Sequence, residues 1–149
     1  MKIYESGENY LETILMLEKR KGAVRSIDVA TELGFSKPSV SVAMKHFREN
    51  GYIVMDAEGY ITLTEAGKKI AARIYERHQL LTKYLIALGV DTQVAQEDAC
   101  KLEHDLSEES FARLRAHYEQ HLRPEDGAAE RGMTVALSLD GPVWARCDQ

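Results

Sequence analysis

Apolar residues in the first fifty positions recur at the three- and four-residue intervals of amphipathic helices. The first stripe precedes the basic run 19–21 and a helix stop at Gly22, and it consists of Tyr10, Leu11, Ile14, Leu15 and Leu17. Glycine just after the last periodic residue commonly ends a helix, so a first helix is predicted to end at this point.

Two short helices are predicted next, each with a serine at its start. Ser26 is expected to cap the second helix and Gly34 to end it, with an apolar face of Ile27, Val29, Ala30 and Leu33. Ser36 is expected to cap the third, which has Pro38 in its first turn, where a missing N–H costs little. The apolar positions of this third helix are Val40, Val42, Ala43, Met44 and Phe47. Only about three or four residues connect the two helices, so they must cross steeply.

A β-hairpin is predicted after the third helix, in the segment YIVMDAEGYITLT. Two β-prone runs flank a turn signal from Asp56 to Gly59. Three helices followed by a hairpin is the element order of a winged helix. We therefore expect a mainly α protein with an N-terminal winged helix-turn-helix domain at residues 1–63.

The second half of the chain returns to helical spacing. Thr64 and Glu65 open a long helix that ends at Leu88 and Gly89, and Asp91 or Thr92 begins the next. Ser107 is expected to cap a last helix that runs to about Leu122.

These helices predict a linker helix and a C-terminal helical domain over residues 64–122. Residues 123–149 lose helical periodicity and gain glycines, and we interpret them as an atypical tail of unassigned role.

Composition is that of an ordinary globular protein. Of 149 residues, 44% are hydrophobic and 29% charged, which excludes bulk disorder, and the length excludes a large enzyme. No apolar run near the start is long enough for a signal peptide or a membrane helix, so we expect a cytoplasmic protein. Cys100 and Cys147 lie far apart in the chain, and a structural disulfide between them is not expected.

The formal net charge of −5 conceals a division between the two halves. Residues 1–80 carry 12 Lys and Arg against 11 Asp and Glu, a net of +1, while residues 81–149 carry 7 against 13, a net of −6. Basic side chains thus lie in the half that would face DNA, and acidic ones in the half that would attract a cation.

The third helix is the candidate recognition helix, because the second helix of a helix-turn-helix enters the major groove with its first residues nearest the bases. Its leading and outward positions are Ser36, Lys37, Pro38, Ser39, Ser41 and Lys45. Small hydroxyl residues permit close approach to base edges and phosphates, and Pro38 offers apolar surface to a thymine methyl. The alternative is a simple helix cap with solvated lysines. The hairpin tip carries two acids and no arginine, so we assign it no base contacts.

A candidate metal cluster lies in the segment CKLEH. Cys100, Glu103 and His104 stand at i, i+3 and i+4, so one helix would present a thiolate, a carboxylate and an imidazole on one face. His78 in the long helix and Glu12 in the first helix would complete the set if the three helices pack together. Mixed S, N and O donors suit Fe(II), Mn(II), Co(II), Ni(II) or Zn(II) better than Ca²⁺ or Mg²⁺.

Other interpretations of these residues remain open. Each of the three clustered side chains taken singly is more often a core or solvated residue than a ligand. A thiol redox sensor would use Cys100 activated by His104, and a small metallohydrolase would use the same ligands but lacks a candidate base with a partner. His117 and His121 form an i, i+4 pair that we interpret as a solvated face.

Taken in order, five segments of the chain resemble the iron- and manganese-dependent repressors typified by the diphtheria toxin repressor and the manganese transport regulator. They are ENYLETILML, FSKPSVSVAMKHFRENGYI, LTEAGKKIA, RHQLL and CKLEHDLS, and the resemblance covers about residues 4–122. It implies a homodimer that binds palindromic double-stranded operator DNA when Fe(II) or Mn(II) is bound, with Zn, Co or Ni as surrogates. The ligand positions of the family would be Glu12, His78, Cys100, Glu103 and His104.

Two departures from the family pattern stand out. Asn9 occupies a position where the manganese branch has aspartate and the iron branch can have methionine, and its amide oxygen would be an uncharged ligand. The second begins with Cys100, which is the iron-branch choice although some manganese sensors also use it. Thr82 and Gln96 stand where an ancillary iron-branch site would need an acid and a histidine, so a second full metal site is not expected.

Overall fold

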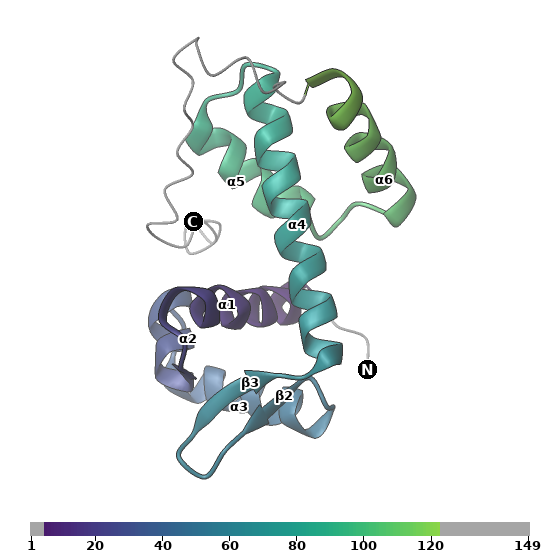
Figure 1. Cartoon of the computed structure of the whole chain (residues 1–149). Helices are drawn as coiled ribbons and strands as arrows, with labels where there is room; N and C mark the ends of the chain where they lie inside the picture. Colours follow the sequence, from purple (N-terminus) through teal and green to yellow (C-terminus); the bar gives the residue numbers. More distant parts are fainter. Residues whose placement is uncertain (1–4, 123–149) are drawn as a thin grey trace. The chain divides into compact units, whose positions relative to one another are not determined.

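The computed structural model describes residues 5–122, which form two compact units (Figure 1). The first unit ends at Glu76 and the second begins at Arg77, so the division between these units falls within one helix, α4. The chain is mainly helical with a small sheet in the first unit, which confirms the predicted fold class. None of the helices in the described part is long and apolar enough to cross a membrane. The tail 123–149, with Cys147, lies outside the described residues.

The first unit begins with the three predicted helices, α1 (Glu5–Lys21), α2 (Ser26–Leu33) and α3 (Lys37–Glu49). Ser36 caps α3 as expected, because its Oγ accepts a hydrogen bond from the Ser39 backbone N–H at 3.3 Å. Helix α2 differs by one position, since Ser26 is its first helical residue and Arg25 is the N-cap. Gly34 ends α2 at φ 68°, a left-handed conformation that glycine adopts without a Cβ penalty.

Two residues predicted for apolar faces are exposed instead. Val42 is 58% exposed and Ile27 is 46% exposed. A helix turns about 100° per residue, so Val42 lies roughly 200° around α3 from the buried Val40, on the opposite side. Ile27 is likewise two positions from the buried Val29. The core face of α3 is therefore narrower than predicted and consists of Val40, Met44 and Phe47, each worth roughly 1.5–3 kcal/mol on burial.

The predicted hairpin is present as β2 (Ile53–Met55) and β3 (Tyr60–Leu63). The Asp56 carboxylate holds its turn by accepting hydrogen bonds from the backbone N–H groups of Glu58 and Tyr60, both at 2.9 Å. A further strand, β1 (Val24–Arg25), pairs antiparallel with β3, giving the sheet order β1-β3-β2. Two residues are too short to show a strand pattern, which is why the sequence did not indicate β1.

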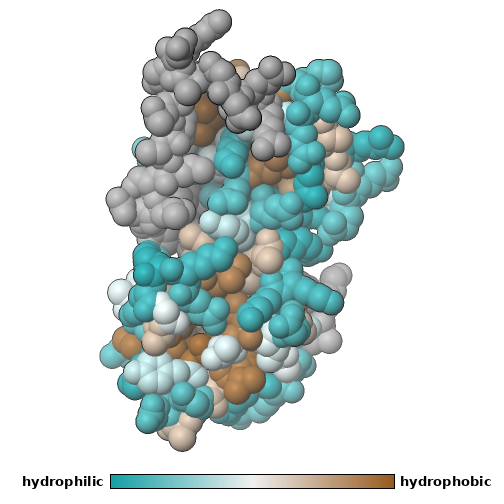
Figure 2. Space-filling view, viewed as in Figure 1, coloured by the Kyte–Doolittle hydropathy of each residue, from teal (hydrophilic) through white to brown (hydrophobic). Residues whose placement is uncertain are grey.

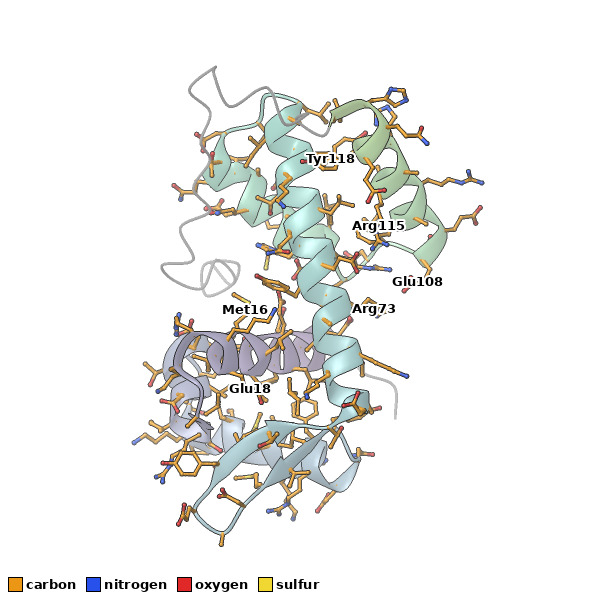
Figure 3. The ribbon with its side chains drawn as sticks, in the orientation of Figure 1. Met16, Glu18, Arg73, Glu108, Arg115 and Tyr118 are labelled. Atoms are coloured by element: carbon orange, nitrogen blue, oxygen red, sulfur yellow. The ribbon has the colours of Figure 1, made fainter. Side chains whose placement is uncertain are left out.

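Helix α4 (Glu65–Ala87) contributes its first turns to the first unit. A Cβ at Gly67 would collide with the Tyr52 carbonyl oxygen, so only glycine allows this approach of the helix to the chain before β2. The Arg73 guanidinium, labelled in Figure 3, forms an ion pair with Glu8 of α1 at 3.3 Å.

The second unit consists of the rest of α4 with α5 (Thr92–Leu102), α6 (Glu108–His117) and a π-helical turn at Tyr118–Leu122. Of the two predicted starts of α5, Asp91 is the cap, and its carboxylate accepts from the Gln93 N–H at 3.1 Å. The predicted cap Ser107 is present, and its hydroxyl accepts from the Ser110 N–H at 3.1 Å. The apolar core of the unit consists of Leu81, Ala95, Ala99, Cys100, Phe111 and Tyr118.

Candidate metal centre and DNA-binding surface

The end of α5 brings three of the predicted donors together. Glu103 is the C-cap of α5 and is completely buried, and its carboxylate lies between two imidazoles. His78 Nδ1 of α4 is 2.8 Å from Glu103 Oε2, and His104 Nε2 is 3.3 Å from Glu103 Oε1. Burial of a carboxylate is costly unless cations or hydrogen-bond donors compensate for lost water, so this placement indicates a polar centre inside the second unit.

Cys100 lies one helical turn before Glu103 and is 3% exposed. The sequence spacing predicts one helix for all three residues, but α5 ends at Leu102, so Glu103 caps the helix and His104 lies in the turn that follows. A thiol shielded from solvent is poorly accessible to oxidants, which counts against the redox-sensor hypothesis.

The remaining two predicted donors belong to α1 of the first unit. Glu12 is completely buried, and the Asn9 side-chain oxygen is buried with no hydrogen-bond donor among residues 5–122. The Thr13 hydroxyl binds the backbone oxygen of Asn9, at 2.7 Å, and not the amide. An uncompensated buried amide oxygen is costly, and it suits a position where an electrophile binds.

The donor types fit a divalent first-row transition ion. They comprise a thiol, two imidazoles, two carboxylates and an amide, all in positions largely shielded from water. Within the described ranges, no three His, Cys, Asp or Glu side chains are already gathered in a metal-holding arrangement. Both carboxylate oxygens of Glu103 face imidazole nitrogens, so a metal ion bound here would replace these contacts.

Arg77 is a residue of this region that the sequence analysis did not identify. It is 2% exposed, and its guanidinium reaches the backbone of the turn after α5 and the start of α6. Ile74, Arg77, His78 and Leu81 form the buried stripe of α4 at helical spacing. The sequence could have identified Arg77 by its position on this apolar stripe, because a fully buried arginine is rare unless it is paired.

His117 and His121 are both exposed, in keeping with a solvated face. Their rings are 4.9 Å apart, and His117 Nδ1 forms a hydrogen bond with the Tyr84 hydroxyl at 2.8 Å.

All the residues predicted to face DNA are exposed, namely Ser36, Lys37, Pro38, Ser39, Ser41 and Lys45. Pro38 and Lys45 lie on the side of α3 opposite the buried Val40, whereas Ser36 and Lys37 are exposed because they stand at the start of the helix. Val42 is exposed among them and adds an apolar side chain that the sequence analysis had placed in the core. Figure 2 shows apolar residues interspersed with polar ones over the first unit on the face in view.

The connection from α2 to α3 is short, and an aromatic residue within it packs against α1. Phe35, within this connection, meets the Tyr10 ring of α1 edge-on with centroids 5.6 Å apart, and Tyr10 also contacts Phe47 of α3 at 5.8 Å. Edge-to-face aromatic pairs contribute about 0.5–1.5 kcal/mol beyond area burial. These ring contacts pack the helix pair against α1.

Comparison with known families matches the chain to two consecutive domains. Residues 2–61 match the "Iron dependent repressor, N-terminal DNA binding domain" and residues 64–127 match the "Iron dependent repressor, metal binding and dimerisation domain".

Individual relatives agree with these matches. The chain is 35% identical over 114 residues to the transcriptional regulator MntR of Escherichia coli O6:H1, covering 76% of this chain and 74% of that protein. It is similar to a manganese-dependent transcriptional repressor solved in complex with manganese (TM-score 0.69, 27% identity, 76% of this chain and 52% of that one). It is also similar to ScaR with bound Zn²⁺ (TM-score 0.65, 26% identity, 76% and 53%). The chain thus spans about half the length of these solved repressors.

Proposed function

The chain belongs to the iron-dependent repressor family of metal-dependent DNA-binding transcriptional regulators, which are not enzymes, and we propose that Fe(II) or Mn(II) activates it to repress metal-homeostasis genes. The observation that carries the proposal is the buried Glu103 carboxylate between His78 and His104. Zn(II), Co(II) and Ni(II) act as surrogates, because the same donors accept them. A cytoplasmic location is part of the proposal.

Six residues are proposed as ligands, and they come from both units. The first unit supplies Asn9 and Glu12, and the second supplies His78, Cys100, Glu103 and His104. A divalent ion contributes positive charge that offsets the buried carboxylates and coordination bonds that join side chains otherwise distant in sequence. The two units are then restricted to the arrangement in which all these donors meet, which we propose is the one competent for DNA.

The DNA surface is proposed to be the exposed side of α3. Lys37 and Lys45 would contact phosphates, while Ser36, Ser39 and Ser41 allow close approach to the bases. Pro38 and the exposed Val42 offer apolar contacts to thymine methyl groups. A homodimer formed through the second domain would place two such helices on a palindromic double-stranded operator.

The test is fluorescence-anisotropy binding to a palindromic metal-transport promoter, with metal-free protein titrated anaerobically at fixed salt with Fe(II), Mn(II) or Zn(II). We expect operator affinity to rise at least tenfold with the activating ion and to stay at its metal-free value in Glu103→Gln. The matched control is Glu119→Gln, an exposed glutamate outside the centre, which keeps the full response. Equal binding with and without every ion would refute metal activation.

A further inference from the structure

Arg77 is a charged side chain enclosed within the second unit. Its Nη1 donates to the backbone carbonyl oxygens of Glu103 at 3.1 Å and Leu106 at 2.5 Å, and its Nη2 forms an ion pair with the Glu108 carboxylate at 3.1 Å. The guanidinium also lies over the Phe111 ring, 5.0 Å from its centroid. Hydrogen bonds from a charged donor are about twice as strong as neutral ones, so these contacts fix the chain that they bind.

The carbonyls that Arg77 binds belong to the turn that carries the proposed ligands. Glu103 and His104 lie at the start of this turn, and Leu106 lies just before the Ser107 cap of α6. The carbonyl oxygens at the end of a helix have no intrahelical partners, and Arg77 supplies donors to the end of α5 where the helix gives way to the turn.

Neighbouring residues of α4 thus hold one glutamate at two points. Arg77 holds the backbone of Glu103, and His78 holds its carboxylate at 2.8 Å. Fixing the backbone removes most of the positions that the carboxylate would otherwise sample. Ligands oriented before binding lose less conformational entropy when an ion arrives, and groups that orient ligands commonly change metal affinity 10- to 100-fold.

We propose that Arg77 is a positioning residue for metal binding: it fixes the turn Glu103–Leu106 so that Glu103 and His104 are oriented as ligands before an ion binds. Through Glu108, which is labelled in Figure 3, Arg77 also joins this turn to the first turn of α6. The inference rests on the proposed function, because it assigns Arg77 a role at the same metal centre.

The experiment compares wild type with Arg77→Met, Arg77→Lys and the control Arg113→Met. Arg113 is an exposed residue of α6, so the control makes the same substitution where no positioning is lost. Each full-length protein is titrated with Co(II), whose visible absorption reports coordination geometry. Amide hydrogen exchange of residues 103–106 is measured in the metal-free protein, and circular dichroism verifies folding.

We expect Arg77→Met to weaken Co(II) binding at least tenfold, to alter the Co(II) spectrum and to speed exchange in the turn. Arg77→Lys keeps the charge, but one ammonium cannot reproduce the planar array of N–H donors of a guanidinium. The Co(II) affinity of Arg77→Lys should therefore fall between those of Arg77→Met and wild type. Arg113→Met should match wild type in all three measurements. If Arg77→Met does not fold, Arg77→Lys decides, and weaker Co(II) binding with faster exchange in the turn supports the proposal.

Wild-type affinity, spectrum and exchange in both Arg77 variants would overturn the role of Arg77 while leaving the metal centre intact. Absence of Co(II) binding in wild type would instead refute the proposed function. Hydrogen exchange in the metal-free protein would still decide whether Arg77 fixes the turn, because that measurement needs no ion.

Discussion

Single carboxylates in this protein have different surroundings and therefore different roles. Glu103 is enclosed by two imidazoles, whereas Asp28 stabilises the start of α2. Asp28 Oδ1 accepts from the Lys21 ammonium at 2.7 Å, and Oδ2 accepts from the Arg25 backbone N–H at 2.8 Å. The hydrogen bond from Lys21, followed by that from Arg25, lowers the pKa of Asp28 below its ordinary value.

Replacing Asp28 by asparagine should reduce stability in a pH-dependent way. The folded state lowers the pKa of Asp28, so its charge stabilises the fold above the unfolded pKa of about 3.9, and this contribution is lost as the pH falls through the lower folded value. We expect Asp28→Asn to lower the free energy of unfolding by about 0.5–1 kcal/mol at pH 7, the scale of a lost cap or ion pair. Urea denaturation at pH 7 and below pH 4 measures the difference.

The difference between Asp28→Asn and wild type should narrow below pH 4, and Glu119→Gln, an exposed control, should show none at either pH. If the free energies of unfolding of Asp28→Asn and wild type differ by the same amount at both pH values, the charge of Asp28 is not the cause of the difference.

Local geometry explains which residue-level predictions succeeded. The spacing of Cys100, Glu103 and His104 predicts one helix face, but α5 ends at Leu102, so Glu103 is its C-cap and His104 lies in the turn beyond it. The contact of His78 with Glu103 joins positions 25 residues apart and depends on how α4 and α5 pack, which spacing does not specify. Val42 was predicted wrongly because an apolar residue was assigned to the core without regard to its angle around α3.

At the scale of elements, helix-capping residues predicted the helix boundaries better than the polarity of side chains predicted their burial. Ser36 and Ser107 are helix caps as predicted, and of the two predicted starts Asp91 and Thr92 the cap is Asp91, each side chain accepting backbone hydrogen bonds there. The predicted cap Ser26 is instead the first residue of α2. Strand β1 was not predicted, since its pairing of Val24 with Ile61 is a tertiary contact.

Helix α3 offers a direct test of its proposed contact with DNA. Lys45 is exposed, and its pairing with Glu49 at 3.9 Å is weak, so its ammonium is available to a phosphate. We expect Lys45→Ala to weaken operator binding across all sequences and to reduce the slope of log K against log salt by about 1. Lys83→Ala removes an exposed lysine of α4 from the second unit and should leave the slope unchanged. Equal slopes for all three proteins would remove Lys45 from the DNA surface.

For the whole molecule, the essential question is how metal binding in one unit affects DNA binding by the other. Glu12 belongs to the first unit, while His78, Cys100, Glu103 and His104 belong to the second. An ion bound by the second unit alone would not favour one arrangement of the two units over another. A ligand shifts an equilibrium between two arrangements only by the difference in its affinity for them.

Glu12→Gln should therefore separate metal binding from DNA binding. The four donors of the second unit remain, so the variant should still bind Co(II), with the thiolate-to-metal absorption that Cys100 provides, though more weakly than wild type. Its operator affinity should stay near the metal-free value at saturating metal, because the variant lacks the proposed charged ligand of the first unit. Anisotropy and absorption measured on the same samples test this, with Glu119→Gln as the control. Metal-activated operator binding equal to wild type would show that Glu12 does not link the two units.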